Sequence, residues 1–446
     1  MDLDRNHDNE NPHLAVLLPE IATNIVTFLP KSDLISSCTL INSTWEHEAR
    51  KRFALSWFLM NAENVAQRQE MSSVWENYAR NIAVSEFPNL SREGPCGNFI
   101  STHGHKVKRL QTRLLPSDVT WPQYFETLSN SFPNLTSIAL VFDNLDDTDS
   151  PQKNRVFFTK VKHLAIYTSS DFEGTQQILR TQLVPLFPNL VTLLCQTICP
   201  SVVRSFLKNA PTLTSLTLIN TVLVGPIREH VVKLTRLEIG NSLFPAFLEP
   251  TLSAFLEISS GTLEYLRVTL VANIDPHLVR NYNGLDIFLP ILPKLRVFEL
   301  VHNDFATRLK GSTNSLVTPA VNLKFEGSST ETRLIYAEQF PVLETLRILK
   351  GVPSQNDKLT EQEFYEASVS FLYNSFLHPS NEACLSLRDL VIPFRARGEM
   401  FKFFNVLECL SENGKCFKWK DPSEVLKRVI AVFPNLIQLE TEDFGG

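Results

Sequence analysis

The residues most able to do chemistry are two pairs of potential metal ligands. Cys195 is separated from Cys199 by three residues, and His103 from His105 by one glycine. Zinc takes four such ligands, yet neither pair has a second Cys or His pair at zinc spacing. We interpret Cys195 as a buried core thiol, and the two histidines as part of a loop.

Motifs for catalysis are also missing. The chain has no phosphate-binding Gly-rich loop, no Gly-x-Ser-x-Gly elbow and no His-Glu-x-x-His pair. The sequence therefore predicts no catalytic, cofactor-binding or metal-binding residues, and a protein that is not an enzyme.

The sequence contains more candidates for binding a partner than for metal binding or catalysis. In several short segments, charged and aromatic side chains alternate with apolar ones. Tyr and Arg most often anchor protein interfaces, and Tyr265, Arg267 and Arg347 together would clamp an acidic or aromatic segment of a partner. Exposure to water would by itself account for any one of these charges. The candidate partner-binding residues are Arg236, Glu238, Tyr265, Arg267, Glu299, Lys324 and Arg347.

A repeat positions these residues. An apolar residue, two variable ones, a second apolar residue, one variable one and a third apolar residue recur, the first nine units lying 21 to 32 residues apart. Alternation turns the last two apolar residues inward and the candidate binding residues to the opposite face. The units are Leu135-Ile138-Leu140, Val161-Leu164-Ile166, Leu190-Leu193-Cys195, Leu213-Leu216-Leu218, Leu234-Leu237-Ile239, Leu263-Leu266-Val268, Leu295-Phe298-Leu300, Ala320-Leu323-Phe325, Leu343-Leu346-Ile348, Leu387-Leu390-Ile392 and Leu436-Leu439-Thr441.

Phe-Pro-Asn-Leu precedes several units, with full copies that begin at Phe132, Phe187 and Phe433. The proline ends a preceding helix, and the phenylalanine supplies a large core side chain. Helical stretches such as Val202 to Asn209 and Glu361 to Leu377 return the chain, so that successive strands run parallel. No unit is stable alone, and stacking buries a continuous core.

This pattern resembles the leucine-rich-repeat solenoid, a parallel sheet with outer helices. The family's turn residue after the strand is matched by Asn303 and in part by Asp143, so we expect an irregular solenoid. After Leu343 the spacing grows to 44 and 49 residues. Either a repeat is hidden near Cys416-Phe417-Lys418-Trp419, or extra helices intrude, with Glu399–Ser411 and Asp421–Val432 as candidates.

The segment from Leu14 to Phe53 predicts three short helices. The first carries Ile21, Ile25 and Leu29 and ends at Pro30, the second covers Leu34 to Leu40, and Asn42 or Ser43 caps the third. A module this small does not bury a sizeable core, so we expect its apolar face to contact something else.

The order and spacing of Leu18-Pro19-Glu20-Ile21, Ile25, Phe28-Leu29-Pro30, Asp33-Leu34, Cys38, Leu40-Ile41 and Trp45 resemble the F-box. Thr39 stands where the family commonly has a basic residue, and Ile41 where it has valine. The resemblance implies docking on a Skp-type adaptor, which joins a cullin scaffold in a ubiquitin ligase. The positions implied to contact the adaptor or to form the core are Leu18, Pro19, Ile21, Ile25, Leu29, Leu34, Leu40, Ile41 and Trp45.

Between these two regions the signals are weaker. We expect a helix from Ala54 through Ile82 and a loop from Ser91 to His105. The predicted organisation is an all-α, three-helix F-box over residues 14–53, a helical linker and start of the solenoid over 54–130, and an irregular α/β leucine-rich-repeat solenoid over 131–446.

Composition narrows the class of protein. The 446 residues carry a formal charge of −6, which argues against a nucleic-acid partner, and the 7 cysteines do not form a disulfide framework. Met1 to Pro12 is polar and unlike a signal peptide, and no apolar run approaches the ~20 residues that span a bilayer. We therefore expect a soluble cytoplasmic or nuclear protein that does not bind membranes.

These patterns lead to two hypotheses. The first is a non-catalytic substrate receptor of a Skp-cullin-F-box ubiquitin ligase, which binds the adaptor through its F-box and an unidentified protein substrate through its repeats. The alternative is a leucine-rich-repeat scaffold or ligand sensor, in which the same helices merely cap the first repeat.

Overall fold

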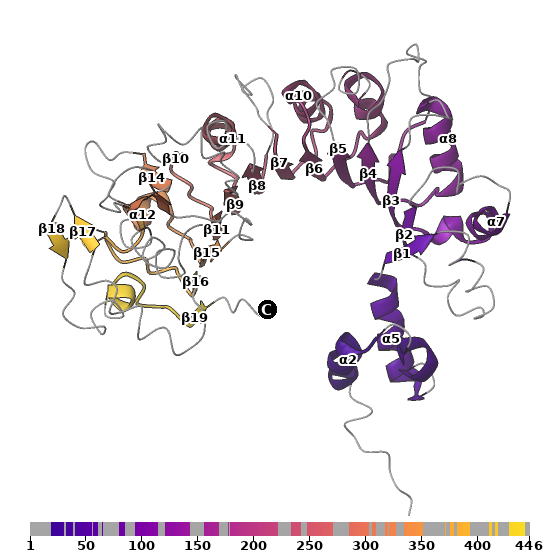
Figure 1. Ribbon diagram of the computed structural model, residues 1–446, viewed down its shortest axis with the longest axis horizontal. Coiled ribbons are helices and arrows are strands. Elements are labelled where there is room, and N and C mark those ends of the chain that lie inside the picture. Colours follow the sequence, from indigo (N-terminus) through magenta and orange to yellow (C-terminus); the bar gives the residue numbers. More distant parts are fainter. Residues whose placement is uncertain are drawn as a thin grey trace, which may run out of the picture. The chain divides into compact units, whose positions relative to one another are not determined.

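The chain is an α/β protein, as predicted, and in the computed structural model it divides into two compact units, Met1–Val161 and Lys162–Gly446. Figure 1 labels the elements of both units. The structure describes residues 19–30, 33–38, 41–55, 57–60, 65, 80–84, 94–114, 121–142, 156–168, 177, 179–221, 233–241, 248–270, 285–302, 306–308, 317–319, 321–326, 334–350, 371, 375–378, 381–392, 410–412, 415–417 and 428–441.

The first unit begins with three helical segments, α2 (Pro19–Phe28), η1 (Leu34–Cys38, a π-helical turn) and α5 (Ser43–Leu55). The predicted cap of the third helix is confirmed: Asn42 Oδ1 accepts hydrogen bonds from the backbone N–H groups of Thr44, at 2.9 Å, and Trp45, at 3.1 Å. A side-chain acceptor at this position satisfies two of the donors that the first helical turn leaves unpaired.

These three segments share a small core. Thr23 of α2 donates a hydrogen bond to Glu48 of α5 across their contact, with 2.8 Å between Oγ1 and Oε2. Leu29 packs partly buried against the core. Its buried members are Ala22, Val26, Leu34, Cys38, Trp45 and Ala49.

The first unit continues into four parallel strands, β1 (Trp57–Met60), β2 (Asn81–Val84), β3 (Arg109–Leu114) and β4 (Ser137–Phe142). The helix predicted from Ala54 through Ile82 is therefore wrong where β1 and the start of β2 lie. The loop predicted from Ser91 to His105 is wrong over α7 (Gly94–His103), and α8 (Trp121–Ser131) connects β3 to β4.

The strand register shows that β1, β2 and β3 belong to the same repeat as β4. Phe58, Ile82 and Leu110 are aligned with Ile138, the second apolar position of the first predicted unit. The third position is occupied by Met60, Val84 and Thr112. Thr112 is polar but buried, and its hydroxyl oxygen lies 3.2 Å from the hydroxyl of the buried Tyr124 on α8. The repeat thus begins at least three strands before Leu135.

The second unit contains nine strands in one parallel sheet, in the order β5-β6-β7-β8-β9-β11-β15-β16-β19, counted over the described residues. The strands lie side by side in the same order in which they occur along the chain. The strands are β5 (His163–Thr168), β6 (Thr192–Gln196), β7 (Ser215–Ile219), β8 (Arg236–Asn241), β9 (Tyr265–Leu270), β11 (Val297–His302), β15 (Thr345–Lys350), β16 (Asp389–Ile392) and β19 (Gln438–Thr441).

Alternation within the strands is as predicted. In β7 the inward Leu216 and Leu218 are fully buried, whereas Ser215 and Thr217 are half-buried on the other face. Short 3-10 and π-helical turns (η4, Leu179–Leu183; η5, Val184–Leu186) precede β6, and α10 (Pro200–Asn209), α11 (Leu248–Ser259) and α12 (Tyr336–Gln339) precede later strands. Figure 1 shows α10 and α11 on one side of the strands, and none of the described helices covers the opposite face of β6 to β9.

The Phe-Pro-Asn-Leu motif has two structural roles. Phe132, Phe187 and Phe433 are buried, which confirms the predicted core side chain. The asparagine has a role that the sequence did not indicate: its side-chain amide donates to a backbone carbonyl one repeat earlier, from Asn134 to His105 at 2.8 Å and from Asn435 to Leu385 at 2.7 Å. The motif therefore joins adjacent repeats at the edge where their strands begin.

One predicted repeat is not part of the main sheet. The unit Ala320-Leu323-Phe325 forms β14 (Val321–Phe325), which pairs with β10 (Leu285–Leu289) in a separate parallel sheet, while β11 pairs directly with β15. Lys324 therefore does not belong to the row of candidate binding residues that contains Glu299 and Arg347, and its assignment to that row was wrong.

Packing and charge both account for this arrangement. Phe325 is buried edge-on against Phe340, with 5.9 Å between ring centroids, and the Gln339 side chain donates to the Glu326 carbonyl at 2.8 Å. A strand inserted between β11 and β15 would also separate Glu299 from Arg347, which form a hydrogen-bonded ion pair at 2.8 Å in the observed order.

The long spacings after Leu343 are filled in part by small elements. β17 (Leu410–Glu412) and β18 (Lys415–Phe417) form an antiparallel pair, so Cys416 belongs to no hidden repeat of the main sheet, and the end of the predicted helix Glu399–Ser411 is a strand. Between β11 and β14 in the sequence, β12 (Ala306–Arg308) and β13 (Val317–Pro319) form another antiparallel pair. Residues 428–432 are helical, within the predicted Asp421–Val432. Asp143, Asn303 and most of Glu361–Leu377 lie outside the described residues.

Across the residues that the structure describes, no helix combines the length and apolar character needed to cross a bilayer.

Candidate functional site

Helix α2 carries an exposed apolar ridge, formed by Ile21, Ile25 and Phe28. These residues are four and three positions apart, so they lie on one side of the helix. Ile21 is half-buried, Ile25 is 41% exposed and Phe28 is 88% exposed. Apolar side chains at this spacing suit a groove on a partner, as in helix-in-groove recognition.

The structure sorts the residues predicted to contact an adaptor into two groups. Leu34 and Trp45 are buried in the core of the helical module, and Leu29 packs against that core. Pro19, Ile25 and Ile41 are exposed. Leu18 and Leu40 lie outside the described residues. Phe28 was not among the predicted contacts, although its position three residues after Ile25 was a usable signal.

The second surface is a group of polar residues on the sheet face opposite α10 and α11, which we call the Glu299 cluster: Arg236 and Glu238 on β8, Tyr265 and Arg267 on β9, Glu299 on β11, and Arg347 on β15. The strand register places Glu238, Arg267, Glu299 and Arg347 directly opposite one another in succession. Six of the seven predicted partner-binding residues are thus brought together, and Lys324 is not.

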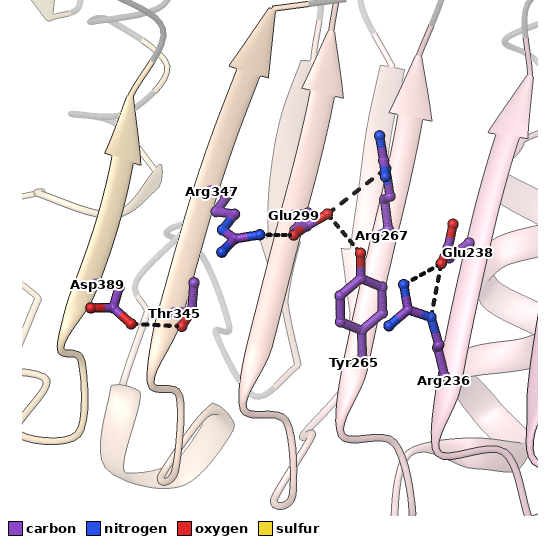
Figure 2. Close-up of polar contacts among 8 residues, drawn as sticks. All are labelled: Arg236, Glu238, Tyr265, Arg267, Glu299, Thr345, Arg347 and Asp389. Atoms are coloured by element: carbon purple, nitrogen blue, oxygen red, sulfur yellow. Dashed lines mark hydrogen bonds and ion pairs between the residues drawn. The ribbon is translucent and has the colours of Figure 1, made fainter. Parts of the chain in front are cut away.

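Glu299 is the centre of the cluster (Figure 2). Its side chain is only 5% exposed, although it lies on the face without helices. Arg347 donates to Oε1 at 2.8 Å, Tyr265 donates to Oε2 at 2.6 Å, and the Nε of Arg267 lies 3.8 Å from Oε2. A buried carboxylate is tolerated where it is paired and hydrogen-bonded, and both oxygens of Glu299 meet that condition.

Arg236 and Glu238 extend the cluster to β8. The guanidinium group of Arg236 donates from both Nε, at 2.8 Å, and a terminal nitrogen, at 2.5 Å, to one oxygen of Glu238. The same guanidinium lies 3.6 Å from the centroid of the Tyr265 ring, which is a cation–π contact. Tyr265 therefore connects Arg236 to Glu299 through its ring and its hydroxyl.

The environment of Tyr265 changes its acidity. Burial raises the pKa of the Tyr265 hydroxyl to about 12, and its hydrogen bond to Glu299 acts in the same direction. The hydroxyl is consequently a neutral donor throughout the physiological range, and its proton stays committed to Glu299.

A second row of alternating charges lies immediately before the strands and was not anticipated. Glu264, Arg296, Glu344 and Arg388 occupy the equivalent position before β9, β11, β15 and β16, as the backbone hydrogen bonds between them show. Arg296 and Glu344 form an ion pair at 2.8 Å, with both side chains exposed to solvent. Opposite charges in adjacent strands could have been read from the sequence only if the order β9-β11-β15-β16 had been known.

The potential metal ligands do not form a cluster. Cys195 is fully buried in β6, as predicted, and burial raises the pKa of its thiol. His103 is buried at the end of α7 and His105 is exposed in a 3-10 turn, η3 (Gly104–Lys106), so the predicted loop is helical here. Among the described residues, no three His, Cys, Asp or Glu side chains are placed to hold a metal ion.

No protein-family model matches the chain, and no curated protein matches it either.

Proposed function

We propose that this protein is the substrate receptor of a Skp-cullin-F-box type ubiquitin ligase. Its N-terminal helical module recruits a Skp-type adaptor, and its repeats, arranged as a leucine-rich-repeat solenoid, bind the protein to be ubiquitinated. The chain itself is not catalytic in this proposal, because the transfer of ubiquitin takes place on other subunits.

The observation that supports adaptor binding is the ridge on α2. The module has a closed small core of its own, so Ile25 and Phe28 are not needed to fill it. An apolar side chain as exposed as Phe28 is costly in water, and a row of such side chains marks an interaction site. A helical cap for the first repeat would instead turn these side chains toward the repeat.

The proposed mechanism is an increase in effective concentration. A receptor that binds the adaptor with one surface and the substrate with another keeps substrate lysines close to a charged ubiquitin carrier. The reaction between substrate and carrier then behaves as an intramolecular one, with a gain set by geometry rather than by new chemistry. No cofactor is required of this chain.

Affinity purification from cells followed by mass spectrometry tests the proposal. The full chain should co-purify a Skp-type adaptor and a cullin, and a chain lacking residues 1 to 53 should lose both together while it retains its substrates. Recovery of both subunits with the shortened chain would contradict the proposal.

The scaffold hypothesis predicts a different result in the same experiment. The full chain would then purify with partners of the repeats but with neither adaptor nor cullin, and the shortened chain would aggregate because its first repeat had lost a cap.

A further inference from the structure

The Glu299 cluster hides its acceptors and exposes its donors. The side chains of Arg236, Arg267 and Arg347 are 45%, 38% and 46% exposed, whereas those of Glu238 and Glu299 are 21% and 5% exposed. Among these five residues there are three positive and two negative charges, and Asp389 on the next strand, β16, accepts a hydrogen bond from Thr345 at 3.3 Å. The more exposed groups from β8 to β15 are therefore the three guanidinium groups, on a chain whose overall charge is −6.

The carboxylates are engaged within the cluster. Both oxygens of Glu299 are paired with Arg347, Tyr265 and Arg267, and one oxygen of Glu238 accepts two hydrogen bonds from Arg236. A guanidinium group has several N–H donors in a planar fork, and these contacts use only part of them. The unused donors on the exposed side of each arginine require acceptors from outside the cluster.

The arginines are also held in place before any partner arrives. Glu299 fixes Arg347 from beneath, and the Tyr265 ring supports Arg236. Ordering a long side chain costs free energy on binding, and that cost falls where the free protein already orders it. The row before the strands differs: Arg296 and Glu344 are both exposed there and present both signs of charge.

Stabilisation of strand pairing explains the alternation of charge but not the asymmetry of exposure. Ion pairs between strands need one acidic residue for each basic residue, and they stabilise the sheet whichever of the two is more exposed to solvent. In the Glu299 cluster both acids, Glu238 on β8 and Glu299 on β11, are less exposed than every arginine that pairs with them.

We propose that the Glu299 cluster binds an extended, anionic segment of a protein partner, whose carboxylate or phosphate oxygens accept hydrogen bonds from Arg236, Arg267 and Arg347. If the proposed function holds, this partner is the ubiquitination substrate. The cluster spans β8 to β15, three strand spacings or about 14 Å, which an extended segment of about four or five residues covers. Carboxylate and phosphate groups both match the guanidinium fork.

Fluorescence anisotropy with the full-length protein tests this inference. The probes are labelled peptides of about eight residues, with glutamate, phosphoserine or serine at alternate positions, and a single-stranded oligonucleotide of equal charge. The glutamate or the phosphoserine peptide should bind, with weakening between about 50 mM and about 200 mM salt, and the serine peptide should not. The two anionic peptides distinguish an acidic segment from a phosphorylated one.

The decisive variant is Arg267→Gln with Glu299→Gln and Arg347→Gln. It removes two of the three arginines without leaving a buried unpaired carboxylate, so folding can be verified by thermal melting before the titration. We expect affinity for the anionic peptide to fall at least about tenfold, and Arg296→Gln, which removes an exposed arginine outside the cluster, to bind as the parent does.

Three results would overturn the inference: no binding of either anionic peptide to the parent, equal binding to the folded triple variant, or binding of the oligonucleotide as tight as that of the peptides. Adaptor binding is measured on the same samples. A parent that binds the adaptor but neither anionic peptide rejects only this inference, whereas a parent that binds an anionic peptide but no adaptor rejects only the proposed function.

Discussion

At the scale of single residues, Glu299 shows how a buried charge depends on its neighbours. It is paired on both sides, and the arginines that pair with it reach solvent. Removing the carboxylate leaves groups that water can hydrate, whereas removing the arginines leaves a carboxylate that water cannot reach. The two changes should therefore differ in their effect on stability, although they break the same contacts.

Urea denaturation should reveal this difference. We expect Glu299→Gln to lower the free energy of unfolding by less than about 1 kcal/mol, because its amide oxygen still accepts from Tyr265. Arg267→Gln with Arg347→Gln should cost about 1 to 3 kcal/mol, because a buried charged acceptor loses its cationic partners. Equal losses in the two variants would mean that Glu299 is not buried in solution.

Glu48 gives the helical module a dependence on pH. Its hydrogen bonds from Lys51, at 2.9 Å, and from Thr23 hold the pKa of this carboxyl below its usual range. Because the pKa is lower in the folded than in the unfolded state, Glu48 stabilises the fold above the ordinary glutamate pKa, and this contribution is lost as pH falls through the folded-state value.

Hydrogen exchange of the amides of α2 and α5, referred to intrinsic exchange rates, measures this effect. Protection in the parent should fall, as the pH is lowered from neutral to well below the ordinary glutamate pKa, by more than it does in Glu48→Gln, which has no carboxylate to protonate. If both proteins lose protection equally, the carboxylate does not link the two helices.

At the scale of elements, the sequence was sufficient to predict the positions of strands and helices whose apolar residues recur at a regular spacing. It located the strands from β4 to β9 and helix α10, because two inward side chains per strand and a buried helical stripe leave a periodic signal. It failed at β3, where Thr112 replaces the third apolar residue and finds a buried hydroxyl partner instead.

Neighbour relations could not be predicted from the pattern. The unit at Ala320-Leu323-Phe325 has the same spacing as the others, and the pattern specifies only which of its side chains are buried. Its placement beside β10 depends on Phe325 meeting Phe340 and on the pairing of Glu299 with Arg347. Neither contact is specified by the spacing of apolar residues within a single unit.

The core and the surface of the helical module should respond differently to truncation. Leu34→Ala removes a fully buried side chain and should cost about 2 to 5 kcal/mol. A core of this size does not absorb such a loss, so α2 and α5 should lose hydrogen-exchange protection while β6 and β7 keep theirs.

The matched control is Ile25→Ala, which changes an exposed residue and should leave protection in α2 as it is in the parent. Unchanged protection in Leu34→Ala would show that the small core does not hold the module together.

At the scale of the whole molecule, stacked repeats share their core, and the last repeat must close it. Phe433 is fully buried and meets the ring of Tyr336, with 5.8 Å between centroids, and β19 pairs with β16. The C-terminal segment should therefore be part of the folded unit rather than an appendage.

Deleting Asp421 to Gly446 tests this role. We expect aggregation or a melting temperature several degrees lower, because the deletion exposes the apolar residues that Val432 and Phe433 cover. Ile437→Ser, which changes an exposed side chain in the same segment, should melt as the parent does. A soluble deletion variant that melts at the parent temperature would remove this segment from the repeat array.

The central claim is that the module recruits a Skp-type adaptor through α2, and a calorimetric titration of the purified adaptor into the full-length protein tests it most directly. The parent should bind, and Ile25→Ser with Phe28→Ser should weaken binding about 100-fold, from roughly 3 kcal/mol of lost apolar burial. Thr27→Ala, on another side of the same helix, should bind as the parent does. A parent that does not bind the adaptor, or a double variant that binds it undiminished, would contradict the account.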